Sequence, residues 1–303
     1  MKIFLKNIFL LLAVSNFIFS QIENSDDWTK GGEATLLFNQ TSFSEWVSGG
    51  ENSISLSFHA DYDLNYEKNG WKWDTKFLGD FGLTKISGSK FLRKTNDRFD
   101  LQSLLGKSFS ERWSYSTVFG VKTQFAKGFT YGENDDGNEI KTLKTQFFSP
   151  VYIQLGVGLY WKKDDKLWVN IAPFTQRLTL VSRKFTMNLT DGKEYFGVKK
   201  GENHRFELGA SVSAFYSFNP MENLELEQRL GLYSDYLGKA ENVDLDYLIS
   251  AKMKVNEKIS TNLIIQLVYD DNAVQKLQTR QIFGIGVNIC LLYTSPSPRD
   301  SDS

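Results

Sequence analysis

The chain has 303 residues and a formal net charge of −1, from 35 basic and 36 acidic side chains. Nucleic acid is therefore not expected as a partner, because binding to phosphates requires an excess of basic residues. The only cysteine is Cys290, which excludes an intramolecular disulfide and a lipid-anchoring cysteine directly after a signal sequence.

The N-terminus has the layout of a secretion signal. Lys2 and Lys6 form a short positive region beside an apolar run over residues 8–19, and a polar stretch follows. The apolar run is too short to cross a bilayer comfortably. We expect a cleaved signal peptide over residues 1–20 and a short periplasmic segment over residues 21–32. No later segment approaches 18 consecutive apolar residues, so a membrane assignment depends on strands.

Alternation of apolar and polar residues dominates the rest of the chain. From Ser53 to Tyr66 every even position is apolar and every odd position polar, and residues 243–255 repeat this pattern with one interruption at Leu248. Successive side chains of a strand point to opposite faces, so each segment is a strand with one apolar and one polar face. The pattern predicts twelve strands, near residues 33–40, 52–66, 71–84, 94–108, 113–126, 149–162, 167–181, 204–218, 223–236, 242–255, 259–270 and 279–289.

The predicted connections alternate between short and mostly long. Tight turns are expected at Glu67–Gly70, Phe109–Arg112, Lys163–Lys166, Asn219–Glu222 and Asn256–Lys258. The other connections are Thr41–Glu51, Lys85–Arg93, Lys127–Phe148, Ser182–Asn203, Leu237–Glu241 and Asp271–Gln278. Short periplasmic turns and long extracellular loops are typical of outer-membrane barrels. We therefore predict an all-β fold, a transmembrane antiparallel up-and-down β-barrel of about twelve strands over residues 33–289.

A soluble barrel with its apolar face inward is the alternative fold, and two observations disfavour it. Most predicted strands are longer than the five or six residues usual in soluble sheets, whereas a bilayer crossing needs about 9–11 tilted residues. A lumen lined only by apolar groups would also enclose a large empty cavity. Aromatic residues near the short-turn ends predict an interfacial belt: Tyr66, Trp71, Trp73, Trp113, Tyr115 and Trp161. We expect the outer membrane of a Gram-negative bacterium, with its lipid as a partner.

The composition changes abruptly at the C-terminal end. Residues 290–303 read CLLYTSPSPRDSDS, where an alternating strand gives way to a tail rich in serine and proline. This string resembles the translation of a sequencing-library adapter. We interpret it as an artefactual tail outside the fold.

Several segments also resemble a known family. They are LLFNQTSFSEWVSGGENS (36–53), RKTNDRFDLQSLLG (93–106), KTQFAKGF (122–129), FFSPVYIQLGVGLYW (147–161), GLYSDYL (231–237) and VYDDN (268–272). Together they resemble DUF3078, a family of uncharacterised envelope proteins of Bacteroidetes, over about residues 28–289. The resemblance implies a Gram-negative outer-membrane setting. It implies no activity, so it assigns no functional residue.

The polar face of the strands carries both signs of charge. A mixed lumen more often forms a network of ion pairs across a barrel than a selectivity ring of one sign. The candidate lumen network consists of His59, Asp61, Asp63, Asp74, Arg98, Asp100, Lys122, Glu225, Glu227, Arg229, Asp244, Asp246 and Lys252. A channel or binding barrel for a small solute and a closed structural barrel both remain open, because the contacts depend on strand register and shear.

The long connection Thr41–Glu51 suggests a second kind of function, the docking of an envelope protein. It places a tryptophan between serine- and glycine-rich flanks, and an exposed aromatic in a loop is a typical interface anchor. The candidate loop residues are Gln40, Phe43, Trp46, Gly49 and Gly50. The oligomeric state is not predicted.

Catalytic and metal sites are not predicted. An envelope enzyme is the least favoured alternative function and depends on Ser57, His59 and Asp61, which share one strand face. Residues two apart on a strand lie about 6.5–7 Å apart, too far for a nucleophile to bond to its base. The segment Asn134–Glu139 lacks the ligand order of a calcium loop and is predicted to be a turn. His59 and His204, the only histidines, lie on different predicted strands. With no phosphate loop, dinucleotide motif or cysteine cluster, we expect neither a cofactor nor an enzyme.

Overall fold

The computed structural model describes residues 27–44, 51–238, 240–256, 258–270 and 272–290. These residues form the strands β1–β16 and one short 3-10 helix, η1 (Arg183–Phe185). Among them, no helix is long and apolar enough to cross a membrane. The predicted signal peptide, the loop residues Trp46, Gly49 and Gly50, and residues 291–303 lie outside the described ranges.

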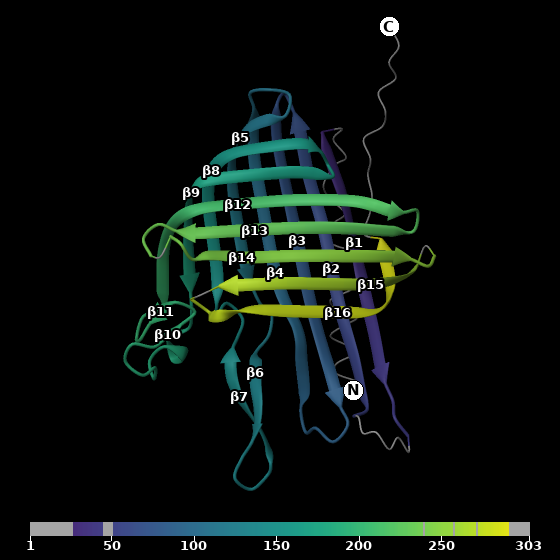
Figure 1. The fold of residues 1–303 in the computed structure, drawn as a ribbon, viewed down its shortest axis with the longest axis vertical. Coiled ribbons are helices and arrows are strands. Elements are labelled where there is room, and N and C mark those ends of the chain that lie inside the picture. The colour runs from purple at the N-terminus through teal and green to yellow at the C-terminus, as the bar shows by residue number, and fades with distance from the viewer. Residues whose placement is uncertain (1–26, 45–50, 239, 257, 271, 291–303) are drawn as a thin grey trace.

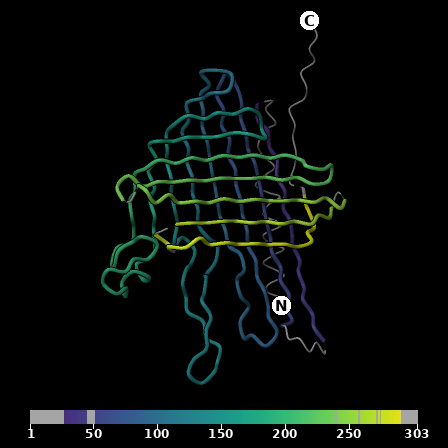
Figure 2. Tube along the Cα trace, in the orientation of Figure 1, coloured from purple at the N-terminus to yellow at the C-terminus, as the bar shows by residue number. Residues whose placement is uncertain are grey.

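Twelve strands close into one antiparallel barrel, as the sequence predicts (Figure 1; Figure 2). The barrel strands are β1 (Trp28–Thr41), β2 (Ser53–Lys68), β3 (Trp71–Ile86), β4 (Leu92–Ser108), β5 (Trp113–Thr123), β8 (Val151–Asp164), β9 (Leu167–Leu180), β12 (His204–Met221), β13 (Leu224–Asp235), β14 (Val243–Lys254), β15 (Ile259–Asp270) and β16 (Val274–Cys290). Each pairs with its neighbours along the chain, and β1 pairs with β16 to close the sheet. In Figure 1 the strands β12–β16 of one wall cross the strands β1–β4 of the other, since barrel strands tilt from the axis.

The starts of β1 and β16 differ most from the prediction, each by five residues. β1 already begins at Trp28, which pairs with Tyr66, because Gly31 and Gly32 carry no side chain and hide the alternation there. β16 begins at Val274 rather than near residue 279, since Gln275–Thr279 is exposed and has no apolar face. The connection before β16 is therefore short. At its other end, β16 extends to Cys290, one residue into the segment predicted to be a tail.

The connections separate into a short-turn end and a long-loop end, as predicted. The short turns occupy residues 69–70, 109–112, 165–166, 222–223 and 255–258. At Asn69 and Gly70 the backbone φ values are 52° and 73°, which a two-residue hairpin turn of this kind requires. The predicted loops contain elements that the alternation did not reveal: the hairpin β6 (Gly128–Glu133) with β7 (Glu139–Thr145), and the short pair β10 (Glu194–Tyr195) with β11 (Val198–Lys199). Both extend from the same end in Figure 1.

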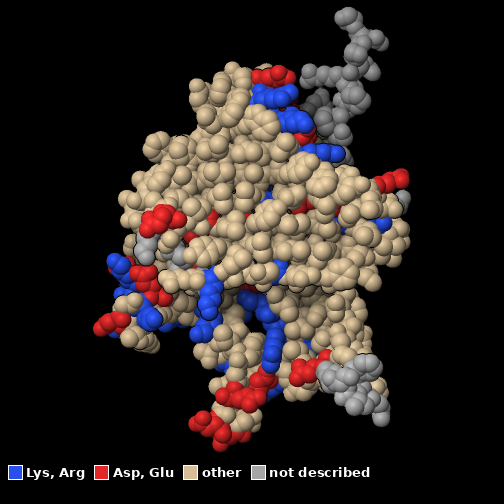
Figure 3. All heavy atoms as spheres, viewed as in Figure 1, with Lys and Arg blue, Asp and Glu red and all other residues tan. Residues whose placement is uncertain are grey.

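The barrel is apolar outside and polar inside, the reverse of a soluble barrel. Ile54, Leu56 and Phe58 are between 46 and 49 % exposed, whereas Asp100 and Glu207 are each 1 % exposed. In Figure 3 the surface over the barrel strands is mostly free of charge, and charged side chains gather toward the ends and loops. An uncharged outer band matches the hydrocarbon layer of a membrane. The closed sheet also suits a membrane, because it has no edge strand whose backbone groups would face lipid unpaired.

An aromatic belt lies near the short-turn end. Trp71, Trp73, Trp113 and Tyr115 are exposed beside the turns that follow β2 and β4. The ring of Trp28 packs 5.0 Å from that of Tyr66 and 5.8 Å from that of Trp73. Amphipathic rings gather at the boundary between lipid and water, so these residues mark one edge of the apolar band.

Candidate functional site

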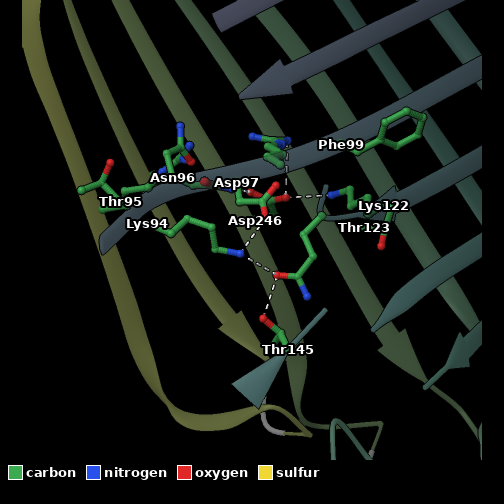
Figure 4. Close-up of a pocket in the computed structure, with 13 residues that line it drawn as sticks. Lys94, Thr95, Asn96, Asp97, Phe99, Lys122, Thr123, Thr145 and Asp246 are labelled. Atoms are coloured by element: carbon green, nitrogen blue, oxygen red, sulfur yellow. Dashed lines mark hydrogen bonds and ion pairs between the residues drawn. The ribbon is translucent and has the colours of Figure 1, made fainter. Parts of the chain in front are cut away.

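Asp246 is the centre of a charged cluster that crosses the lumen. Its carboxylate accepts a hydrogen bond from Lys122 Nζ at 2.7 Å and one from Gln266 Nε2 at 2.7 Å (Figure 4). Arg98 Nη2 lies 3.9 Å from the same carboxylate and 2.6 Å from Asp100. Along the shorter path around the barrel, four strands separate β5 from β14: β8, β9, β12 and β13. The contact between Lys122 and Asp246 therefore joins facing walls.

A second tie joins β2 to β13. Lys76 Nζ lies 2.7 Å from both Asp61 and Asp63, and Arg229 Nη2 reaches Asp61 from the facing wall at 3.6 Å. Arg229 also pairs with Glu227 at 3.0 Å. The strands β2 and β13 are separated by β1, β16, β15 and β14, so this contact also crosses the lumen.

Further ties lie toward the short-turn end. Lys252 on β14 bonds to Glu33 on β1, and the Tyr160 hydroxyl on β8 donates to Asp74 on β3 at 3.2 Å. Glu225 lies opposite Lys252 in the register of β13 and β14. Most of the thirteen residues of the candidate lumen network thus form ion pairs or hydrogen bonds with one another or with residues beside them.

Arg177 is the largest omission of the sequence analysis. Its Nε and Nη2 donate to the two oxygens of Glu207, each at 2.8 Å, and its Nη1 lies 2.6 Å from Asp244. The guanidinium group also lies 4.0 Å from the ring centre of Tyr233. Arg205, also not selected, pairs with Asp235 at 3.2 Å.

A cavity of about 430 Å³ lies on the long-loop side of the Asp246 cluster. Its wall includes the long-loop ends of β4 and β5 together with Gln266 and Arg280, and the labelled side chains in Figure 4 surround it. The lining residues are Lys94, Thr95, Asn96, Asp97, Arg98, Phe99, Lys122, Thr123, Gln124, Thr145, Asp246, Gln266 and Arg280. A second cavity, of about 930 Å³, lies between Arg177, Arg205 and the loop around β10 and β11.

The side chains considered for catalysis do not form a catalytic arrangement. The Nδ1 atom of His59 lies 2.6 Å from Asp80 on β3, not beside Asp61. In the described part of the chain no hydrogen bond joins Ser57 to His59. His204 is exposed and contacts Asn203. Within the same residues, no group of three or more His, Cys, Asp or Glu side chains is placed to hold a metal ion.

The loop candidates are only partly described. Gln40 is paired with Ile54 at the exposed end of β1, and the Phe43 N–H donates to Asn52 at 2.5 Å. Docking through this loop therefore stays a prediction. In the segment Asn134–Glu139, residues 134–138 form the turn of the β6–β7 hairpin, as predicted, and Glu139 begins β7. The N–H of Gly137 donates to the Asn134 carbonyl at 2.9 Å.

Comparison with solved structures finds other barrels. The translocator domain of the autotransporter NalP from Neisseria meningitidis is 11 % identical, with a TM-score of 0.40 over 93 % of this chain and 94 % of that one. An outer membrane channel from Pseudomonas putida F1 is 12 % identical, with a TM-score of 0.37 over 89 % and 97 %. The NanC porin is 11 % identical, with a TM-score of 0.34 over 86 % and 98 %. The assignment of the barrel rests on its own closed sheet rather than on these similarities.

Comparison of the sequence with curated proteins gives no significant match. The family model of DUF3078, a protein of unknown function, matches residues 38–129, and so confirms over this part of the chain the resemblance that its motifs indicate.

Proposed function

We propose that this outer-membrane β-barrel has a lumen closed by ion pairs between facing walls, and that it holds a small polar solute in the cavity on their long-loop side. We place it in the outer membrane of a Gram-negative bacterium, with the long loops outside the cell. The uncharged outer band and the aromatic residues at its edge support the membrane setting. The separation of short turns from long loops supports this orientation. We assign no catalytic role to Ser57, His59 or Asp61.

The contact between Lys122 and Asp246 is the main observation that supports a closed lumen. It joins facing walls at 2.7 Å, and Arg98 and Gln266 converge on the same carboxylate. Arg229 and Asp61 make the second crossing. A solute that passes along the axis would have to separate charged partners, which is costly because each would be left without its partner in a partly buried site.

Removal of the long cationic side chains tests the closure. We predict that the double variant Arg98→Ala with Lys122→Ala admits small sugars, because it removes two side chains from the central cluster, whereas the wild-type protein does not. Swelling of liposomes that contain the folded protein measures this entry. The matched control, Lys163→Ala with Lys166→Ala, removes the same charge from the exposed end of β8 and the turn that follows it, and should behave as wild type. Equal swelling of wild type and the central double variant would contradict the closure.

A further inference from the structure

Arg280 lines the 430 Å³ cavity and has unused hydrogen-bonding capacity beside it. Its Nη1 bonds to the side-chain oxygen of Asn96, but its Nε and Nη2 are buried and have no hydrogen-bond partner among the residues that the structure describes. The nearest carboxylate, that of Asp80, lies 3.7 Å from Nη2, and one of its oxygens is already 2.6 Å from His59. A guanidinium group presents these two donors side by side, in the geometry that suits a carboxylate.

The two carboxylates of the cavity wall, in contrast, already accept hydrogen bonds. The two oxygens of Asp246 accept from Lys122 and Gln266. The oxygens of Asp97 accept from Lys94 at 2.6 Å and from the backbone N–H groups of residues 125 and 126 at 2.6 and 2.9 Å. Both carboxylates of the lining are therefore paired, whereas four of its side chains are cationic: Lys94, Arg98, Lys122 and Arg280. Buried donors without a partner are costly, so a ligand that supplies acceptor oxygens would be favoured here.

We infer that this cavity binds a small hydroxylated carboxylate, held by its carboxylate at Arg280. The cavity volume is within the range of ligand sites, and Arg98 and Lys122 add positive charge to its wall. Asn96, Thr95 and Thr145 in the same wall bear amide and hydroxyl groups that suit the hydroxyl groups of such a solute. The inference names the solute class of the proposed function and rests on it for the claim that the solute is held above a closed lumen.

Gluconate and sorbitol form a matched pair of probes, because they share a six-carbon polyol chain and differ in the carboxylate. We expect calorimetric titration of the folded full-length protein to detect gluconate binding but no sorbitol binding. Arg280→Gln should weaken the affinity for gluconate roughly tenfold or more, since a charge-assisted pair of hydrogen bonds is lost. The control Arg112→Gln removes the same charge from the exposed β4–β5 turn, outside the cavity lining, and should leave the affinity within twofold.

Two outcomes would overturn the inference: sorbitol binding as tightly as gluconate, or Arg280→Gln binding gluconate within twofold of wild type. If Arg280→Gln does not fold, Arg280→Lys keeps the charge but loses the planar fork, and a loss of gluconate affinity of about threefold or more is then expected. Liposome swelling is independent of this measurement. A barrel that admits sugars yet binds gluconate through Arg280 would contradict the closure and leave the carboxylate site standing.

Discussion

Arg177 shows how a single charge is stabilised inside the barrel. Its guanidinium group makes two parallel hydrogen bonds to Glu207 and a third contact to Asp244, on strands to one side of β9. Charge-assisted bidentate pairs are among the stronger hydrogen bonds, and a carboxylate left alone in such a site is strongly unfavourable. Glu207 is 1 % exposed, so solvent cannot replace the arginine. The pair therefore fixes β9, β12 and β14 relative to one another.

We predict that Arg177→Met lowers the free energy of unfolding by about 3–5 kcal/mol, the usual cost of removing one partner of a buried ion pair. Adding Glu207→Gln should recover part of this loss, because it removes the charge that has lost its partner. Unfolding in denaturant measures both effects, with the difference in gel mobility between folded and unfolded protein as the readout. The control Arg112→Met lies in the exposed β4–β5 turn and should change stability by well under 1 kcal/mol. A single variant as stable as this control would contradict the role of Arg177.

At the scale of strands, the alternation predicts the barrel well but loses its phase at β9. In the first half of β9 the even residues 168, 170 and 172 face inward. Beyond Pro173 the odd residues Thr175, Arg177 and Thr179 face inward, because a bulge there shifts the register against β12. The alternation of the first half of β9 therefore assigns Arg177 to the outer face, although it lies in the lumen. A proline in a long strand indicates such a bulge and could have revealed the change of phase. A Cβ at Gly158 would lie 1.9 Å from the Ile171 carbonyl oxygen, so β8 can follow this irregular segment only with glycine there.

The β6–β7 hairpin is joined to the barrel rim by Glu139. Its carboxylate accepts hydrogen bonds from Arg93 at 2.6 Å and from the Lys90 N–H at 2.6 Å. These hydrogen bonds hold the pKa of Glu139 below its usual value, and the bond from Arg93 has the largest effect. Because the pKa is lower in the folded protein, the carboxylate stabilises the joined hairpin above its unfolded pKa of about 4.3, and this stabilisation is lost as the pH falls through the lowered value.

We therefore predict that acidification from pH 7 to pH 3 reduces the protection of the β6–β7 hairpin against hydrogen exchange more than that of the barrel strands. Protection factors, corrected for the intrinsic exchange rate at each pH, measure this loss. In Glu139→Gln the hairpin should already be less protected at pH 7 and should change little on acidification. Equal hairpin protection at both pH values in the wild-type protein would show that Glu139 does not hold it.

At the scale of the whole molecule, the sequence predicts which side chains enter the lumen but not which of them meet. Parity along each strand places Asp61, Lys122, Arg229 and Asp246 inside, because most of their neighbours along the strand are apolar and face outward. Their partners depend on the register between strands and on how the sheet closes, which no single segment encodes. The contacts Lys122–Asp246 and Arg229–Asp61 bring together residues far apart in the chain, and the cavity around Arg280 exists only because these walls face each other.

The closed lumen is the central claim, and conductance across a planar bilayer tests it most directly. The purified, folded full-length protein should insert without steady single-channel current at moderate voltage, because ion pairs bridge facing walls of the lumen. The variant Arg98→Ala with Lys122→Ala should conduct under the same conditions. Steady open channels of the wild-type protein, with a conductance equal to that of the variant, would contradict the claim.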